Sequence, residues 1–303
     1  MASENAFLPI SALSPDQDLS SEGLSFWRDG FSRLKKSRRA KIALSILSFF
    51  VLLALIGPWI SGHTYYDINL EIKNTPPSNL FWLGSDDLGR DLFTRLCYGI
   101  RISLFVGLAA ALIDLIIGVT YGAFAAFCGG KTDEVLMRLI DILSTIPDLL
   151  IIIALTVVFG TGLGSIILAF IVTGWISMAR IIRSKILQTK SADYVLASKT
   201  MGAGAKHIFV CHLIPSCIGP MAVMITLSIP IAIFTEAILS FLGLGVQVPI
   251  ASLGSLAHDG LTSMQYYPWR LFFPSIAISC IILSFNVLGD ILRDCFDPKG
   301  KNT

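Results

Sequence analysis

The sequence predicts an all-helical membrane protein with six transmembrane helices, and its composition is the first observation behind this prediction. Of the 303 residues, 54% are hydrophobic and only 15% are charged, and the mean hydropathy is +0.73. Ordinary soluble domains carry about 25% charged residues, so this chain lies outside their range. Its net charge of +2 comes from Lys and Arg residues spread along the chain, which form no basic patch for nucleic acid.

The second observation is a set of long apolar runs. A helix rises about 1.5 Å per residue, so about 20 apolar residues cross a hydrocarbon core about 30 Å thick. Six runs meet or approach this length: Ile42 to Ile60, Ile102 to Phe127, Val135 to Gly160, Gly164 to Ala179, Cys217 to Gly245 and Leu271 to Gly289. The first 27 residues are polar and lack the apolar core of a signal peptide, so we expect the first run to be a retained membrane anchor.

The third observation is the distribution of basic residues, since positively charged flanks of membrane spans stay in the cytoplasm. With the N-terminus inside, the cytoplasmic segments carry 18 of the Lys and Arg residues and the outside segments carry five. This imbalance predicts that both termini and the loop between the fourth and fifth spans are cytoplasmic.

That loop, Ser191 to Ser216, is polar, basic and interrupted by glycines. Ser191 or Thr189 can cap a helix with Asp193 in its first turn. Small and apolar residues then recur at helical spacing: Tyr194, Ala197, Ser198 and Met201.

The second half of the loop contains breaks of its own. Gly202 and Gly204 end the first helix, and a second short helix runs until Pro215 ends it before the fifth span. Two short helices joined by such a bend can bind a partner protein and transmit its movement to the following span. An alternative is an amphipathic hairpin that rests on lipid headgroups, with which Lys199, Lys206 and His207 are compatible.

The residues of this loop resemble a known family. "YVLASKTMG" followed by "HLIP" is similar to the cytoplasmic loop of binding-protein-dependent ABC importer permeases, in which Glu-Ala-Ala, three residues and Gly precede a final Leu-Pro. Ala197, Ser198, Gly202 and Pro215 match this pattern. The chain departs from it at Leu196, where Glu is usual, and at Ile214 before the proline.

The resemblance continues outside the loop. "LGSDDLGRDLFTRLCYGIRISLFVG", "DILSTIPDLL", "GWISMARIIRSKIL", "EAILSFLGLG" and "GDILRDCFDP" resemble, in the same order, the second permease of dipeptide, oligopeptide and nickel importers. This implies a type I importer permease of the bacterial inner membrane. It also implies the partners: a homologous second permease, two ABC ATPase subunits and an extracytoplasmic solute-binding protein.

These expectations divide the chain into five parts: a cytoplasmic segment 1–41, the anchor 42–60, an extracytoplasmic segment 61–99, a five-span core 100–294 and a cytoplasmic tail 295–303. By the resemblance, the loop 191–216 couples the core to the ATPase through Asp193, Tyr194, Ala197, Ser198, Gly202, Lys206 and Pro215. The implied substrates are short peptides, with nickel or another small solute as the alternative.

We expect this chain to bind no cofactor, because the ATP would be used by the partner subunits. Its "CGGKT" segment ends like a phosphate-binding loop, but Ala125 stands where the first glycine of that motif is required, and no strand precedes it. Six cysteines occur without a CxxC pair, and His207, Cys211 and His212 lack a carboxylate or second pair to complete a metal site.

Charged residues inside apolar runs usually face a cavity or a partner. We expect Asp141 to pair with Arg138, three residues earlier on the same helical face. Asp114 and Glu236 lack a partner nearby in sequence, so each could line the pathway, relay protons or bond to another span. For Glu236 we expect a partner across a subunit contact.

Two other classes of protein remain as alternatives. An ion-coupled secondary transporter would use Asp114, Asp148 and Glu236, but it would leave the ordered cytoplasmic loop without a function. An intramembrane enzyme would need a nucleophile with a nearby base or a His pair with an acid, and no span contains such a set.

Overall fold

The computed structural model describes residues 34–296. Its α-helices are α2 (Arg38–Ser61), α3 (Leu92–Ile113), α4 (Val119–Cys128), α5 (Gly130–Thr145), α6 (Asp148–Phe159), α7 (Leu163–Ala169), α8 (Ile176–Lys190), α9 (Asp193–Thr200), α10 (Ala205–Ile208), α11 (Ile214–Phe241), α12 (Leu253–Thr262) and α13 (Trp269–Phe296). Within residues 34–296 there is one isolated β-bridge, between Ser85 and Asp91, and no strand. The fold class is therefore all-helical, as predicted.

Three spans consist of two α-helices joined by a π-helical turn. The π-helical turns Asp114–Gly118, Phe170–Gly174 and Phe209–Leu213 connect α3 to α4, α7 to α8 and α10 to α11. Together with α2 and α13, this gives five continuous helices long and apolar enough to cross a membrane.

The third predicted span is not one helix, and in this respect the prediction was wrong. α5 and α6 meet at a bend of 79°, and only as a bent pair do they make a sixth span. Ile146 has an extended backbone, with φ −86° and ψ 126°. The ring of Pro147 disfavours a helical conformation at the residue before it, so the break follows from the sequence.

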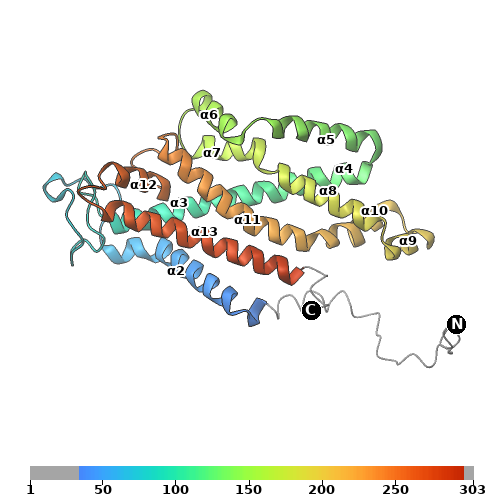
Figure 1. Ribbon diagram of the computed structural model, residues 1–303, viewed down its shortest axis with the longest axis horizontal. Coiled ribbons are helices and arrows are strands. Elements are labelled where there is room, and N and C mark those ends of the chain that lie inside the picture. The colour runs from blue at the N-terminus through green and yellow to red at the C-terminus, as the bar shows by residue number, and fades with distance from the viewer. Residues whose placement is uncertain (1–33, 297–303) are drawn as a thin grey trace, which may run out of the picture.

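The helices run roughly along the long axis of the molecule (Figure 1). The segment between α2 and α3 lies at one end with α12, and α9 and α10 lie at the other. Loops predicted to share a side of the membrane therefore lie together. Both chain termini, and with them Arg28, Arg33, Lys299 and Lys301, lie outside the described residues.

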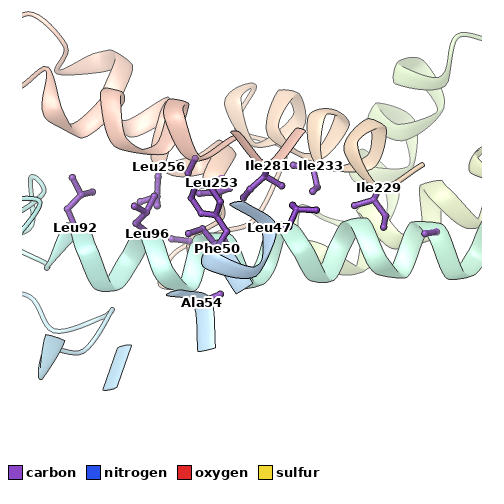
Figure 2. Close-up of a cluster of buried hydrophobic side chains, with 14 residues drawn as sticks. Leu47, Phe50, Ala54, Leu92, Leu96, Ile229, Ile233, Leu253, Leu256 and Ile281 are labelled. Carbon is purple, nitrogen blue, oxygen red and sulfur yellow. The ribbon is translucent and has the colours of Figure 1, made fainter. Parts of the chain in front are cut away.

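The largest apolar core lies between α2, α3, α11, α12 and α13 (Figure 2). Phe50 from α2, Leu96 from α3 and Ile281 from α13 are all buried in it. α12 contributes Leu253 and Leu256, although it is too short to cross the membrane. The anchor helix thus packs against the five-span core through side chains of its own.

Candidate coupling site and buried polar groups

The first helix of the loop 191–216 is α9, and its start differs from the prediction. Ala192 is the N-cap residue and makes no side-chain capping bond. The Ser191 hydroxyl donates to the carbonyl oxygen of Gln188 at 2.9 Å, and the Thr189 hydroxyl to that of Lys185 at 2.9 Å. Both hydroxyls thus bond back to the preceding helix, and only Asp193 remains to interact favourably with the α9 N-terminus.

α9 rests on the bundle through one buried side chain and exposes the rest of its surface. Val195 is buried in an apolar cluster that also contains Ile208 and Leu213. Ala197 is exposed, and so is Met201, at 79% of its surface. The small side chain of Ala197 therefore faces away from the bundle, where a partner could approach closely.

A bend follows α9, as the sequence predicted. Gly202 has φ +88°, a backbone conformation that a residue with a Cβ adopts only at a cost. The Gly202 amide donates to the carbonyl oxygen of Lys199 at 3.1 Å. The Lys206 side chain lies beyond the bend, exposed in α10.

The second prediction for the loop, that Pro215 ends a separate short helix, was wrong. α10, the π-helical turn Phe209–Leu213 and α11 form one continuous helix, Ala205–Phe241. Pro215 lies in the first turn of α11, directly after the π-helical turn, and the helix continues although proline has no N–H group to donate. The loop is therefore one short helix, one bend and the start of the fifth span.

His212 joins the two arms of the loop. Its Nε2 and the Ser198 hydroxyl share a hydrogen bond of 3.1 Å, and its ring lies edge-on to Tyr194, with the ring centroids 5.9 Å apart. Partial burial raises the pKa of the Tyr194 phenol above its ordinary value. The sequence analysis considered His212 only as a metal ligand, and within residues 34–296 no group of three His, Cys, Asp or Glu side chains could hold a metal ion.

Asp141 has a different partner from the one expected. Its Oδ1 lies 3.1 Å from Nη2 of Arg180 in α8. The same guanidinium donates to the Ser144 hydroxyl at 2.7 Å. Asp141 therefore links two spans, while the predicted partner, Arg138, is exposed on α5.

Asp114 lies in the π-helical turn of the second span and is buried, with 6% of its surface exposed. One carboxylate oxygen accepts a hydrogen bond of 2.5 Å from Ser228 in α11. The other, Oδ1, has no hydrogen-bond partner within the described chain and lies next to Gly174. Of the three outcomes left open for Asp114, the structure shows a bond to a neighbouring span.

Glu236 is completely buried, and its partners belong to this chain. Its Oε2 accepts from Ser103 of α3 at 2.9 Å and its Oε1 accepts from Ser240 of α11 at 2.6 Å. The Ser103 oxygen in turn accepts from the backbone amide of Leu253, at the start of α12, at 3.3 Å. The expected contact across a subunit boundary is therefore not what satisfies this carboxylate.

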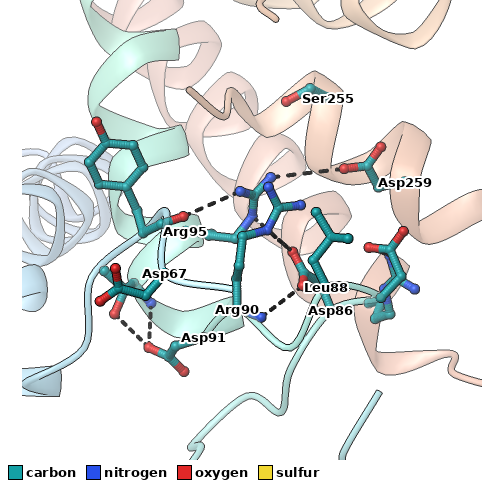
Figure 3. Close-up of polar contacts among 12 residues, drawn as sticks. Asp67, Asp86, Leu88, Arg90, Asp91, Arg95, Ser255 and Asp259 are labelled. Atoms are coloured by element: carbon teal, nitrogen blue, oxygen red, sulfur yellow. Dashed lines mark hydrogen bonds and ion pairs between the residues drawn. The ribbon is translucent and has the colours of Figure 1, made fainter. Parts of the chain in front are cut away.

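The sequence analysis missed a buried charged cluster at the opposite end from the loop (Figure 3). The Asp86 carboxylate lies 2.7 Å from Nε of Arg90 and 3.3 Å from Nε of Arg95. Asp259 in α12 lies 3.9 Å from Nη2 of Arg95, and burial raises the pKa of its carboxyl group while Arg95 opposes the rise. The "GSDDLGRD" spacing could have suggested the i, i+4 pair of Asp86 and Arg90, but not the approach of α12.

The segment that ends like a phosphate-binding loop, Cys128 to Thr132, runs from the last residue of α4 through Gly129 into the first turn of α5. It follows a helix where a phosphate-binding loop follows a strand. The geometry that cradles phosphate is therefore absent from this segment.

A bundle of five continuous spans and one bent span, with a short exposed helix at one end, has the fold of an ABC transporter permease. The inward-facing structure of the MetNI methionine ABC transporter matches 66% of this chain and 95% of its own chain, with a TM-score of 0.54 and 17% identity. A second crystal form of the same transporter gives the same TM-score.

The chain belongs to the family of binding-protein-dependent transport system inner membrane components, whose model matches residues 118–302. A second model, the N-terminal TM domain of oligopeptide transport permease C, matches residues 25–77. The resemblance stated from the loop motif is thereby confirmed, and this chain is a multi-pass membrane permease.

Two relatives from Bacillus subtilis (strain 168) are similar over almost the whole chain. The oligopeptide transport system permease protein OppC is 48% identical, over 98% of this chain and 97% of the relative. The dipeptide transport system permease protein DppC is 51% identical, over 91% and 87%. The corresponding OppC of Escherichia coli (strain K12) is 37% identical, over 94% and 95%.

Proposed function

We propose that this chain is one of two homologous permease subunits of an ATP-driven importer of dipeptides or oligopeptides. The names of its relatives support the substrate class. An extracytoplasmic binding protein would deliver the peptide, and two ATPase subunits would hydrolyse ATP, so this chain would bind no cofactor. Its mechanism is alternating access, in which the spans rock to open the pathway to each side in turn.

We propose further that both termini lie in the cytoplasm, from the distribution of Lys and Arg. The chain would then lie in the bacterial inner membrane with its extracytoplasmic end, formed by residues 62–91 and α12, toward the binding protein. Accessibility of a cysteine introduced at Lys199 from outside the cell would contradict this orientation.

The observation that carries the proposal is the exposed surface of α9. Ala197 is exposed on a helix that is held to the bundle by Val195 and to the π-helical turn Phe209–Leu213 by the hydrogen bond between Ser198 and His212. A small side chain on an exposed helix suits insertion into a groove of another subunit. We therefore propose that the ATPase docks here and pushes through the bend at Gly202 into α11.

Two substitutions test the docking. Ala197→Trp should reduce co-purification of the ATPase subunit at least tenfold, because the larger side chain does not fit the groove. Gly202→Val should leave the chain in the membrane but uncouple ATP hydrolysis from uptake, because valine strains the bend. Ala197→Ser is the matched control and should behave as the wild type.

The measurements are ATPase pull-down and uptake of a labelled tripeptide at matched membrane levels. A hairpin that rests on lipid predicts unchanged values for both variants, since neither change meets a partner, and that result would refute the docking. Uptake of nickel but not of the tripeptide by the wild-type complex would refute the peptide assignment alone.

A further inference from the structure

α8 leads into the proposed coupling loop, since it ends at Lys190 and α9 begins at Asp193. Three basic residues of α8 point toward α4 and α5: Arg180, Arg183 and Lys190. At about 100° per residue, all three lie within an arc of about 80° on the helix. The face that they form is therefore continuous from the middle of α8 to its end.

Each of the three contacts a different part of the helical hairpin formed by α4 and α5. The guanidinium of Arg183 holds Asp133 with two bonds, Nε to Oδ1 at 2.5 Å and Nη2 to Oδ2 at 2.6 Å. Lys190 donates to the carbonyl oxygens of Ala126 and Phe127 at the end of α4. Arg180 donates to Asp141, two turns further along α5.

α4 and α5 are attached to α8 in different ways. α4 packs tightly, because a Cβ on Gly122 would lie only 2.3 Å from the carbonyl oxygen of Ala179. A buried interface of this kind resists sliding because its side chains interlock, so α4 is fixed closely to α8. α5 buries two side chains, Asp133 and Ile140, and Ile140 packs with Ile176 and Ala179 of α8, so α5 contacts α8 through one apolar cluster and through ion pairs.

The Asp133–Arg183 pair is the stronger of the two ion pairs between α5 and α8. Both bonds are short and parallel, which is the geometry that favours an Arg–carboxylate pair most. Asp133 is 8% exposed, so its charge would be left in a poorly solvated position if Arg183 were removed. By contrast, the side chains of Arg180 and Asp141 are 46% and 58% exposed, and ion pairs between exposed side chains contribute little to stability.

α5 is also the helix that ends at the 79° bend before α6. Any displacement of its first turn changes the position of that bend. A movement of α8 can reach the bend through Asp133, at one end of α5, while α4 moves with α8 as one unit.

We infer that the Asp133–Arg183 ion pair transmits the movement of the coupling loop from α8 to α5, and so sets the position of the bent α5–α6 span during transport. Arg183 is a positioning residue: it acts on the pathway through α5. This inference rests on the proposed function, because the movement begins where the ATPase docks.

The experiment uses the whole complex in proteoliposomes. The amounts of binding protein and of tripeptide are controlled both inside and outside the vesicles. Asp133→Arg should lower uptake at least tenfold while ATPase subunits still co-purify and ATP is still hydrolysed. Exchanging the charges, Asp133→Arg with Arg183→Asp, should restore uptake to within about threefold of the wild type. Asp133→Asn, which keeps the shape but not the charge, should give an intermediate loss.

Glu134 provides the matched control. It is adjacent to Asp133 and exposed, and within residues 34–296 it makes no hydrogen bond or ion pair. Glu134→Arg makes the same change of charge and should leave uptake within twofold of the wild type.

Two results would overturn the inference. In the first, Asp133→Arg takes up peptide at the wild-type rate. In the second, Asp133→Asn is present at a lower membrane level but transports normally per molecule, which would assign the pair to folding alone. A wild-type chain that retains no ATPase subunit would instead refute the proposed function, and this inference with it.

Discussion

The two ends of the molecule use their charged residues in opposite ways. At the end formed by residues 62–91 and α12, the arginines are buried: Arg90, Arg95 and Arg270 are 3%, 1% and 4% exposed. In the loop 191–216, Lys199 and Lys206 are exposed and make no ion pair within residues 34–296. One end uses its charges to hold its own segments together, while the other leaves them at the surface.

The difference places the charges that stabilise the fold at one end of the molecule, away from the loop for which we propose partner binding. Arg270, at the start of α13, donates to Asn74 at 3.0 Å and to Asp87 at 3.1 Å. It therefore holds to α13 a segment that lies nearly 200 residues away in sequence. α9, by contrast, is held by one buried side chain and one hydrogen bond to the next helix. A loop with few attachments can respond to a partner without unfolding the bundle.

The largest effect on stability is expected for Asp86→Ala. The Asp86 carboxylate accepts from the amides of Leu88 and Arg90 at 3.0 and 2.9 Å and pairs with two buried guanidinium groups. Its removal leaves those cations without their main counter-charge, which costs about 3–5 kcal/mol. Unfolding in detergent micelles with increasing SDS or urea would measure the loss.

Glu71→Ala is the control for this variant, since Glu71 is an exposed acid of the same segment. It should change the free energy of unfolding by less than about 0.5 kcal/mol. Equal effects of the two substitutions would contradict the assignment of stability to the buried cluster.

A smaller loss of stability is expected for Glu236→Gln. Both carboxylate oxygens of Glu236 accept from serine hydroxyls, and Ser103 and Ser240 also accept from backbone amides. A glutamine NH₂ group cannot accept, so the serine that faces it must turn its proton away and accept from the NH₂ group instead. A buried serine proton left without an acceptor costs about 1–3 kcal/mol. The same unfolding measurement applies.

Asp114→Asn is the comparison for this change, because Asp114 accepts only one hydrogen bond, from Ser228. The asparagine oxygen can keep that bond while its NH₂ group occupies the side that has no partner. We therefore expect a smaller loss than for Glu236→Gln. A larger loss of stability for Asp114→Asn than for Glu236→Gln would show that the serines around Glu236 can bond equally well to a carboxylate and to an amide.

Much of the fold could be predicted from the sequence, because span length and hydropathy are local properties. Five spans were found that way, and the break in the sixth could have been predicted from Pro147. The continuity of α10 with α11 could not, because a π-helical turn has no simple sequence pattern and accommodates Pro215 without ending the helix.

The candidate site was predictable only in part. The bend at Gly202 followed from residue type, and the exposure of Ala197 agrees with the family pattern. The partners of Asp141 and Glu236 were not predictable, because Arg180 and Ser103 lie 39 and 133 residues away. Local spacing favoured Arg138 for Asp141, but a side chain on a neighbouring helix was better placed.

The smallest effect is expected for Ser198→Ala, which removes the hydrogen bond between α9 and His212. A neutral bond at a half-exposed position contributes about 0.5–1.5 kcal/mol, and here it stabilises only the local closure of the loop. Hydrogen exchange of the α9 amides should therefore become about 3- to 10-fold faster, while the unfolding of the whole bundle remains unchanged.

Thr200→Ala is the control. The Thr200 hydroxyl donates to Ala197 within α9, at 2.8 Å, so its removal should not loosen α9 from the next helix. A loss of global stability as large as that of Asp86→Ala would contradict the comparison, since it would mean that the coupling loop holds the bundle together as much as the buried cluster at the opposite end.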